Sequence, residues 1–189
     1  MAEAVRVQID SFRQVLLRHG LSGLVLALIC LIPEQPRTSV QASLRLFETQ
    51  GERIASVALL LLALMVIASA FGRGGLSARQ WAWLGYLLLV SIAEEWAFRF
   101  ALPLWLMPAI GLLPAIALCN LAFGAMHRFT LGWGWARCLG ATLGAFGLSL
   151  LLARTSLLHV IALHWLVTFA NTPWPPRGRA ISSPSPAAG

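Results

Sequence analysis

Two adjacent glutamates and one arginine are the only charged residues in a long apolar stretch of this sequence. Glu94, Glu95 and Arg99 lie between Trp81 and Leu102. Glu95 precedes Arg99 by four residues, which is the favourable order for an ion pair along a helix. Glu94 would project about 100° away from Glu95 around that helix, where it has no local counter-charge. A buried carboxylate without an ionic partner is suited to general acid–base catalysis, so Glu94 is the first candidate catalytic residue.

Two histidines lie in other apolar stretches, and each has further residues at helical spacing on its own face. These neighbours are Asn120 and Phe123 before His127, and Thr168 and Asn171 after His164. A single histidine in a helix is usually a satisfied core residue, but an acid and two histidines on three separate segments indicate a shared site. Such a site can support proton transfer, or it can bind zinc through Glu94, His127 and His164. The other histidines, His19 and His159, are expected at the membrane interface.

The composition is that of an integral membrane protein. Of the 189 residues, 58% are hydrophobic and only 11% are charged, which leaves too few polar side chains to cover a soluble domain. The net charge of +7 would suit a protein that binds nucleic acid, but all fourteen basic residues are arginines, scattered singly near the ends of apolar runs. This distribution is typical of membrane topology, so the expected surroundings are the lipid bilayer and no nucleic-acid partner is expected.

Six apolar segments predict an all-α fold, a polytopic membrane helix bundle of about six transmembrane helices. The segments are Val15–Ile32, Ile54–Phe71, Trp81–Leu102, Leu112–His127, Cys138–Ala153 and Leu157–Asn171. Pro103 and Pro108 are expected to end the helix that carries the glutamates, because proline donates no backbone hydrogen bond. The polar stretch at 34–53 has apolar residues at helical spacing and predicts an interfacial helix.

The chain divides into three parts, with a cytoplasmic N-terminal segment at 1–14, a transmembrane domain at 15–171 and a tail at 172–189. The tail is rich in Ser, Pro and Ala and is expected to be disordered. With the N-terminus inside, nine arginines lie on the cytoplasmic side and four on the other side. Both termini are therefore expected in the cytoplasm, at the inner (plasma) membrane of a bacterium.

The candidate site residues form three motifs in a fixed order. Residues 94–99 read EEWAFR, an EExxxR motif, and residues 123–127 read FGAMH, an FxxxH motif. His164 follows on a third apolar segment. The motifs, their intervals and their placement resemble the CPBP family of intramembrane endopeptidases, which includes the type II CAAX prenyl endopeptidases. The resemblance covers residues 81–171.

The resemblance implies a role for each motif residue. Glu94 would be the general base that activates water, aided by His127. Glu95 and Arg99 would form a supporting ion pair. His164 would stabilise the oxyanion of the tetrahedral intermediate.

One residue departs from the family pattern. The third motif is usually HxxxN, and Thr168 stands here in the place of its asparagine. A threonine hydroxyl can donate one hydrogen bond, with a shorter reach than an amide. Asn171 lies one turn further along the same face and is the alternative donor, although its distance along the helix favours Thr168.

The leading hypothesis is an intramembrane endopeptidase that cleaves a membrane-associated protein or peptide near the membrane surface, without a metal cofactor. The resemblance implies C-terminal sorting signals or propeptides as substrates. A proton-coupled transporter is one alternative, because intramembrane Glu and His also mark proton relays. A non-catalytic membrane scaffold or immunity protein on the same fold is another.

Overall fold

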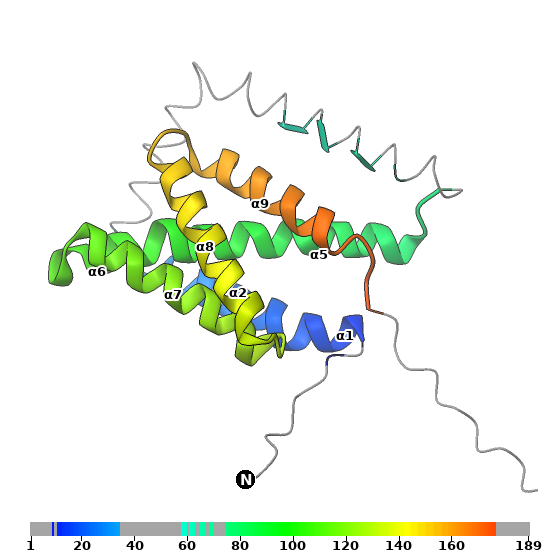
Figure 1. Ribbon diagram of the computed structural model, residues 1–189, viewed down its shortest axis with the longest axis horizontal. Helices are drawn as coiled ribbons and strands as arrows, with labels where there is room; N and C mark the ends of the chain where they lie inside the picture. Colours follow the sequence, from blue (N-terminus) through cyan, green and yellow to red (C-terminus); the bar gives the residue numbers. More distant parts are fainter. Residues whose placement is uncertain are drawn as a thin grey trace, which may run out of the picture.

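The computed structural model describes residues 9, 11–34 and 75–176, together with scattered residues between 58 and 69. All regular structure among these residues is helical, and they contain no strand. Figure 1 shows the labelled helices gathered into one bundle around the long α5, which confirms the prediction of an all-α fold. The predicted helices at 34–53 and 54–71 lie wholly or mostly outside the described residues, as does the tail from residue 177 onward.

The N-terminal helix is continuous but changes its winding on the way. Its three elements are α1 (Phe12–Val15), η1 (Leu16–Gly20) and α2 (Leu21–Ile29). A capping box starts it, because the Ser11 hydroxyl accepts from the Gln14 N–H while the Gln14 side chain accepts from the Ser11 N–H. η1 is a π-helical segment, a widened turn that often occurs at functional sites.

The helix that carries the two glutamates is longer than predicted. It comprises α5 (Ala78–Glu94), the π-helical η3 (Glu95–Ala101) and α6 (Leu102–Ile110). The prediction that Pro103 and Pro108 end this helix is wrong. The Leu102 N–H already bonds to the carbonyl of Ala97, five residues back, so the chain is wound widely where Pro103 enters and can accept a residue without an N–H. The helix ends at Gly111, whose φ of 84° favours glycine.

The last three helices match predicted segments to within a few residues. They are α7 (Leu112–Thr130), α8 (Trp135–Leu152) and α9 (Leu157–Asn171). Asn120 of α7 donates to Ser149 of α8 at 3.0 Å and accepts from the same hydroxyl at 3.2 Å, which joins the two helices inside the bundle. α9 lies beside α5, where the Trp165 indole N–H donates to the carbonyl of Leu84 at 3.2 Å (Figure 1).

Residues 172–176, the first part of the predicted tail, also contact α5. The Trp83 indole N–H donates to the carbonyl of Thr172 at 2.8 Å, and the Arg79 guanidinium donates to the carbonyl of Pro176. Two side chains of α5 therefore fix the chain after it leaves α9.

The described residues place apolar side chains on the outside and ionisable groups on the inside. Leu113, Leu143 and Leu150 are more than 60% exposed, whereas Glu94 and Glu95 are at most 1% exposed. Water would disfavour this distribution, but lipid favours it, because lipid solvates leucine and penalises charge. Three helices are long and apolar enough to cross a membrane, namely 12–29, 112–130 and 135–152, and α9 is a shorter apolar helix. The fold is thus a membrane helix bundle, as predicted.

We expect Gly124→Ala to destabilise the protein, because α7 and α8 touch at this glycine. A Cβ at position 124 would meet the Thr142 hydroxyl and lie 2.8 Å from the carbonyl of Cys138. Forcing an extra methyl group into such a contact costs about 1–3 kcal/mol, so the melting temperature in detergent should fall by several degrees.

Gly147→Ala is the matched control, because no atom lies within 4 Å of the Cβ position at this helical glycine of α8. Its melting temperature should equal or exceed that of the wild type, since alanine favours helix. An equal loss of stability in both variants would contradict the close contact at Gly124.

Candidate active site

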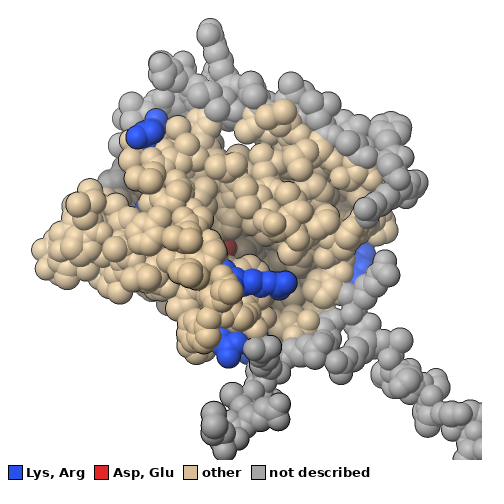
Figure 2. Space-filling view, viewed as in Figure 1, with Lys and Arg blue, Asp and Glu red and all other residues tan. Residues whose placement is uncertain are grey.

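The two adjacent glutamates lie at the junction of α5 and η3, in the interior of the bundle. Glu94 is 1% exposed and Glu95 is fully buried. Figure 2 shows a hollow in one face of the molecule, with an acidic side chain visible at its floor and a basic side chain at its edge. Glu94 and Glu95 are thus enclosed by protein, and the hollow in this face reaches an acidic side chain.

Glu95 and Arg99 form the ion pair expected from their spacing. The Arg99 Nε atom lies 3.3 Å from Glu95 Oε2, and both side chains are fully buried. The guanidinium also lies over the ring of Phe123 in α7, 3.8 Å from its centroid, in a cation–π contact. The other carboxylate oxygen, Glu95 Oε1, lies 2.7 Å from His164 Nδ1 of α9. This one carboxylate therefore connects the helix of the glutamates with α9 and, through Arg99, with α7.

Glu94 has different partners from Glu95. Its Oε1 lies 3.2 Å from His19 Nε2, and its Oε2 lies 3.8 Å from His164 Nε2. Glu94 was expected to have no counter-charge on its own helix. Its two partners, His19 and His164, indeed come from other helices. The partners are imidazoles, so within the described residues Glu94 has no direct arginine contact comparable to that of Glu95.

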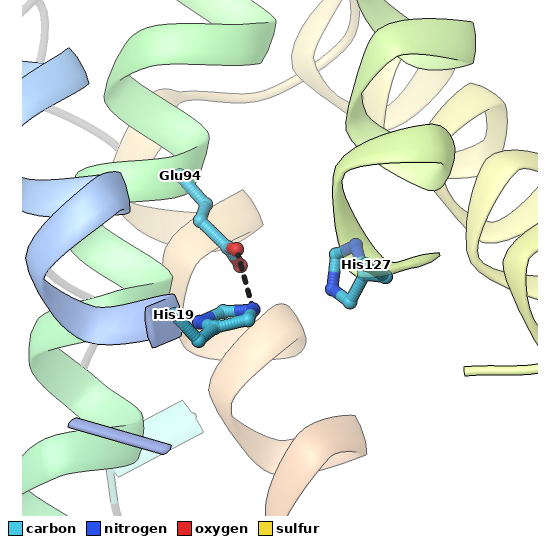
Figure 3. Close-up of side chains that lie close together, drawn as sticks. All are labelled: His19, Glu94 and His127. Atoms are coloured by element: carbon cyan, nitrogen blue, oxygen red, sulfur yellow. Dashed lines mark ion pairs between the residues drawn. The ribbon is translucent and has the colours of Figure 1, made fainter. Parts of the chain in front are cut away.

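His127 of α7 completes the cluster. Its Nδ1 lies 2.8 Å from the carbonyl of Phe123. Because a carbonyl can only accept, Nδ1 carries the proton of this hydrogen bond, and Nε2 is the ring nitrogen left for contacts within the cluster. The ring is buried and lies edge-on to that of His19, with 5.2 Å between centroids (Figure 3). Ligand-type atoms of His19, Glu94 and His127 all lie within 4.8 Å of one another. Since His164 also lies 3.8 Å from Glu94, the structure brings the predicted residues Glu94, His127 and His164 together.

His19 is the site residue that sequence reasoning missed. It was expected at the membrane interface, but it is 4% exposed and contacts Glu94. The reason is its place on the helix, because Val15, Gly23 and Ala27 lie at four-residue intervals from it and are also buried. This row of small and apolar residues around a histidine was the signal that could have identified it.

The two candidate oxyanion donors of α9 lie differently. Asn171 is exposed, and its amide donates to the carbonyl of Val167 in its own helix at 2.9 Å, so the structure does not bring it to the cluster. Thr168 is partly buried, one turn after His164. Its hydroxyl makes no hydrogen bond to the other described residues of the cluster. His159 pairs with Ser156 at 2.6 Å, near the start of α9.

Comparison with known proteins agrees with the motifs. The model of the type II CAAX prenyl endopeptidase Rce1-like family matches residues 76–170, about half of the chain. The chain belongs to this family. The match includes the residues of all three motifs and excludes His19 and Asn171. No curated protein and no solved structure matches the chain.

This protein is therefore an integral membrane protein of a family of intramembrane proteases, as the motifs predicted. The assignment rests on the segment from α5 to α9, which carries both glutamates and two of the three histidines of the cluster. The N-terminal helix that supplies His19 lies outside this segment.

We expect Glu95→Gln to destabilise the protein far more than Glu94→Gln. Without the Glu95 carboxylate, Arg99 becomes a buried cation without its nearest counter-charge, and breaking a buried pair in this way costs about 3–5 kcal/mol. Among the described residues the ion-pair partners of Glu94 are histidines, to which a glutamine can still offer hydrogen bonds. The melting temperatures and membrane yields of both variants, measured in the same detergent, would test this. Equal melting temperatures would contradict the supporting function of Glu95.

Proposed function

We propose that this protein is an intramembrane endopeptidase in which Glu94 is the general base. The observation that carries the proposal is a buried carboxylate held between histidines of two other helices, His19 at 3.2 Å and His164 at 3.8 Å. A charged residue inside a membrane bundle is costly and is kept mostly where it has a function. Glu95 and Arg99 compensate each other's charge, whereas the two close partners of Glu94 are histidines, which carry a charge only when protonated.

The reaction is hydrolysis of a peptide bond. A water molecule attacks the carbonyl carbon while Glu94 takes one of its protons, which forms a C–O bond and leaves the former carbonyl oxygen negatively charged. The intermediate then expels the amine, the C–N bond breaks and Glu94 returns the proton to the leaving nitrogen. The products are an amine and a carboxylic acid, which releases its proton to water, and Glu94 is regenerated as a carboxylate.

Two further residues support the negative charge of the intermediate in this scheme. His164 is held by Glu95 through Nδ1, so its Nε2 faces the space beside Glu94 and can donate to the oxyanion when it carries a proton. Thr168 is the proposed second donor, in the family position of the asparagine. His127, with Nε2 directed away from its backbone partner, would assist Glu94.

The proposed substrate is a membrane-associated protein or peptide that carries a C-terminal sorting signal or a propeptide. The hollow in Figure 2 supports this, because it gives an extended peptide and water a route toward acidic residues that lipid would otherwise enclose. The arginine distribution supports a bacterial plasma membrane with both termini in the cytoplasm.

We expect Glu94→Gln to abolish cleavage while the protein stays folded, since the variant keeps the shape of the side chain but cannot act as a base. The loss should be about 100- to 10,000-fold. The measurement is a map of C-terminal peptides in membranes of cells that express either the wild type or the variant. Peptides that are shortened only with the wild type would be substrates. Identical maps, with equal amounts of both proteins, would contradict the proposal.

We also expect Thr168→Val to reduce cleavage with the fold intact, because the variant keeps the shape and removes the donor. The loss of one oxyanion donor typically lowers kcat about 100- to 1000-fold, which is the largest decrease expected here. Asn171→Ala is the control and should retain nearly full activity, since Asn171 is exposed and bonded within its own helix. A wild-type rate in Thr168→Val would show that His164 acts without this hydroxyl.

A metal-dependent hydrolase is the second candidate. The observation that favours it is the approach of His19, Glu94 and His127, whose ligand-type atoms lie within 4.8 Å of one another. Two histidines and a carboxylate form a common zinc ligand set with an open position for water. This set differs from the predicted one, because His19 replaces His164. Zinc that copurifies in a one-to-one ratio, with activity lost on chelation and restored by zinc, would favour this candidate.

A further inference from the structure

His19 occupies a position in the site that no family motif accounts for. It lies in η1 of the N-terminal helix, and its ring contacts Glu94 and Tyr86 of α5 and the ring of His127 in α7. Figure 3 shows its ring below the carboxylate of Glu94, joined to it by the dashed line of the ion pair. A buried histidine in this place needs a physical account.

The neighbours of His19 suit one arrangement of its ring proton. Nε2 lies 3.2 Å from Glu94 Oε1 in an ion-pair contact, and because a carboxylate can only accept, a hydrogen bond between these atoms requires Nε2 to donate. In the neutral ring Nδ1 is then an acceptor, and the Tyr86 hydroxyl at 3.3 Å is a group that can donate to it. With Nε2 as the donor, Tyr86, His19 and Glu94 can form a chain in which each proton is directed toward the carboxylate.

The approach of Tyr86 depends on a glycine beside His19. A Cβ at Gly20 would lie 2.9 Å from Tyr86 Cε2, so a larger residue there would displace the tyrosine ring. The Tyr86 ring is also stacked on Trp83, with 5.2 Å between centroids, which fixes it from the other side. The sequence thus provides both the space and the support that this hydrogen-bond chain needs.

We propose that His19 is a positioning residue that holds Oε1 of Glu94 and leaves Oε2 to take the proton of the attacking water. This inference rests on the proposed function of Glu94. Oε2 is the oxygen that faces His164, at 3.8 Å, a separation at which one water molecule can contact both atoms. A carboxylate held by one oxygen presents the other in a fixed direction, and a general base needs such a fixed geometry.

The first test uses purified full-length variants and a peptide that spans a cleavage site found in the C-terminal map. His19→Phe fills the space but cannot donate, and we expect kcat to fall about 10- to 100-fold, less than on loss of the base itself. KM should stay within about twofold, because the substrate is bound elsewhere. His19→Gln should recover most of the rate, since its amide can donate to Glu94. Leu17→Ala, at an exposed position of the same helix, should match the wild type.

These outcomes separate the inference from the function on which it rests. If Glu94→Gln cleaves normally, the proposed function fails. If Glu94→Gln is inactive but His19→Phe has a wild-type kcat, only the function of His19 is wrong. Equal losses in His19→Phe and His19→Gln, together with lower melting temperatures, would show that His19 is only a packing residue.

The second test needs no substrate. In full-length protein with ¹⁵N-labelled histidine, NMR should show His19 protonated at Nε2 and accepting at Nδ1, and Tyr86→Phe should shift the Nδ1 signal. A proton on Nδ1, or no response to Tyr86→Phe, would overturn the proposed hydrogen-bond chain.

Discussion

The buried contact between Glu95 and Arg99 is the interaction on which the rest of the site depends. Both groups lie inside a bundle whose outer surface is apolar, so each must find its partners within the protein. Each member of the pair has one further contact, because the Arg99 guanidinium lies over Phe123 of α7 and the Glu95 carboxylate contacts His164 of α9. An unpaired charge in lipid is costly, so these contacts stabilise the packing of α7 and α9 against the helix of the glutamates. The candidate site lies where these three helices meet.

The change of winding at η3 gives this pair its surroundings. The helix passes from α to π geometry between Glu94 and Glu95, so the two glutamates lie on either side of the transition. A wider turn alters the direction of each following side chain and lets the chain continue through Pro103. η1 is a second π-helical segment, and it carries His19. Both widened segments thus supply residues of the same cluster.

Sequence patterns revealed the contacts within a helix better than those between helices. The four-residue spacing of Glu95 and Arg99 predicted their pair, and apolar length predicted α7, α8 and α9, because these features are local. The partners of Glu94 were not local, since His19 lies 75 positions before it in the sequence. The continuity of α5 into α6 was also missed, because hydrophobic periodicity does not show which carbonyl accepts the Leu102 N–H. Asn171 was the alternative donor on the face of His164, but a shared face does not show that an exposed amide bonds to its own helix.

The two glutamates have different partners, and this difference underlies the different functions that we propose for them. Glu95 is bound by a permanent cation, so its charge is compensated. Glu94 is bound by imidazoles, which can donate, accept or carry a proton as the reaction requires. A base must gain and lose a proton during each turnover, and a carboxylate locked to an arginine is poorly suited to that cycle. The proposed division between a structural and a reactive glutamate thus follows from which partner each receives, and the helix–helix packing decides that partner.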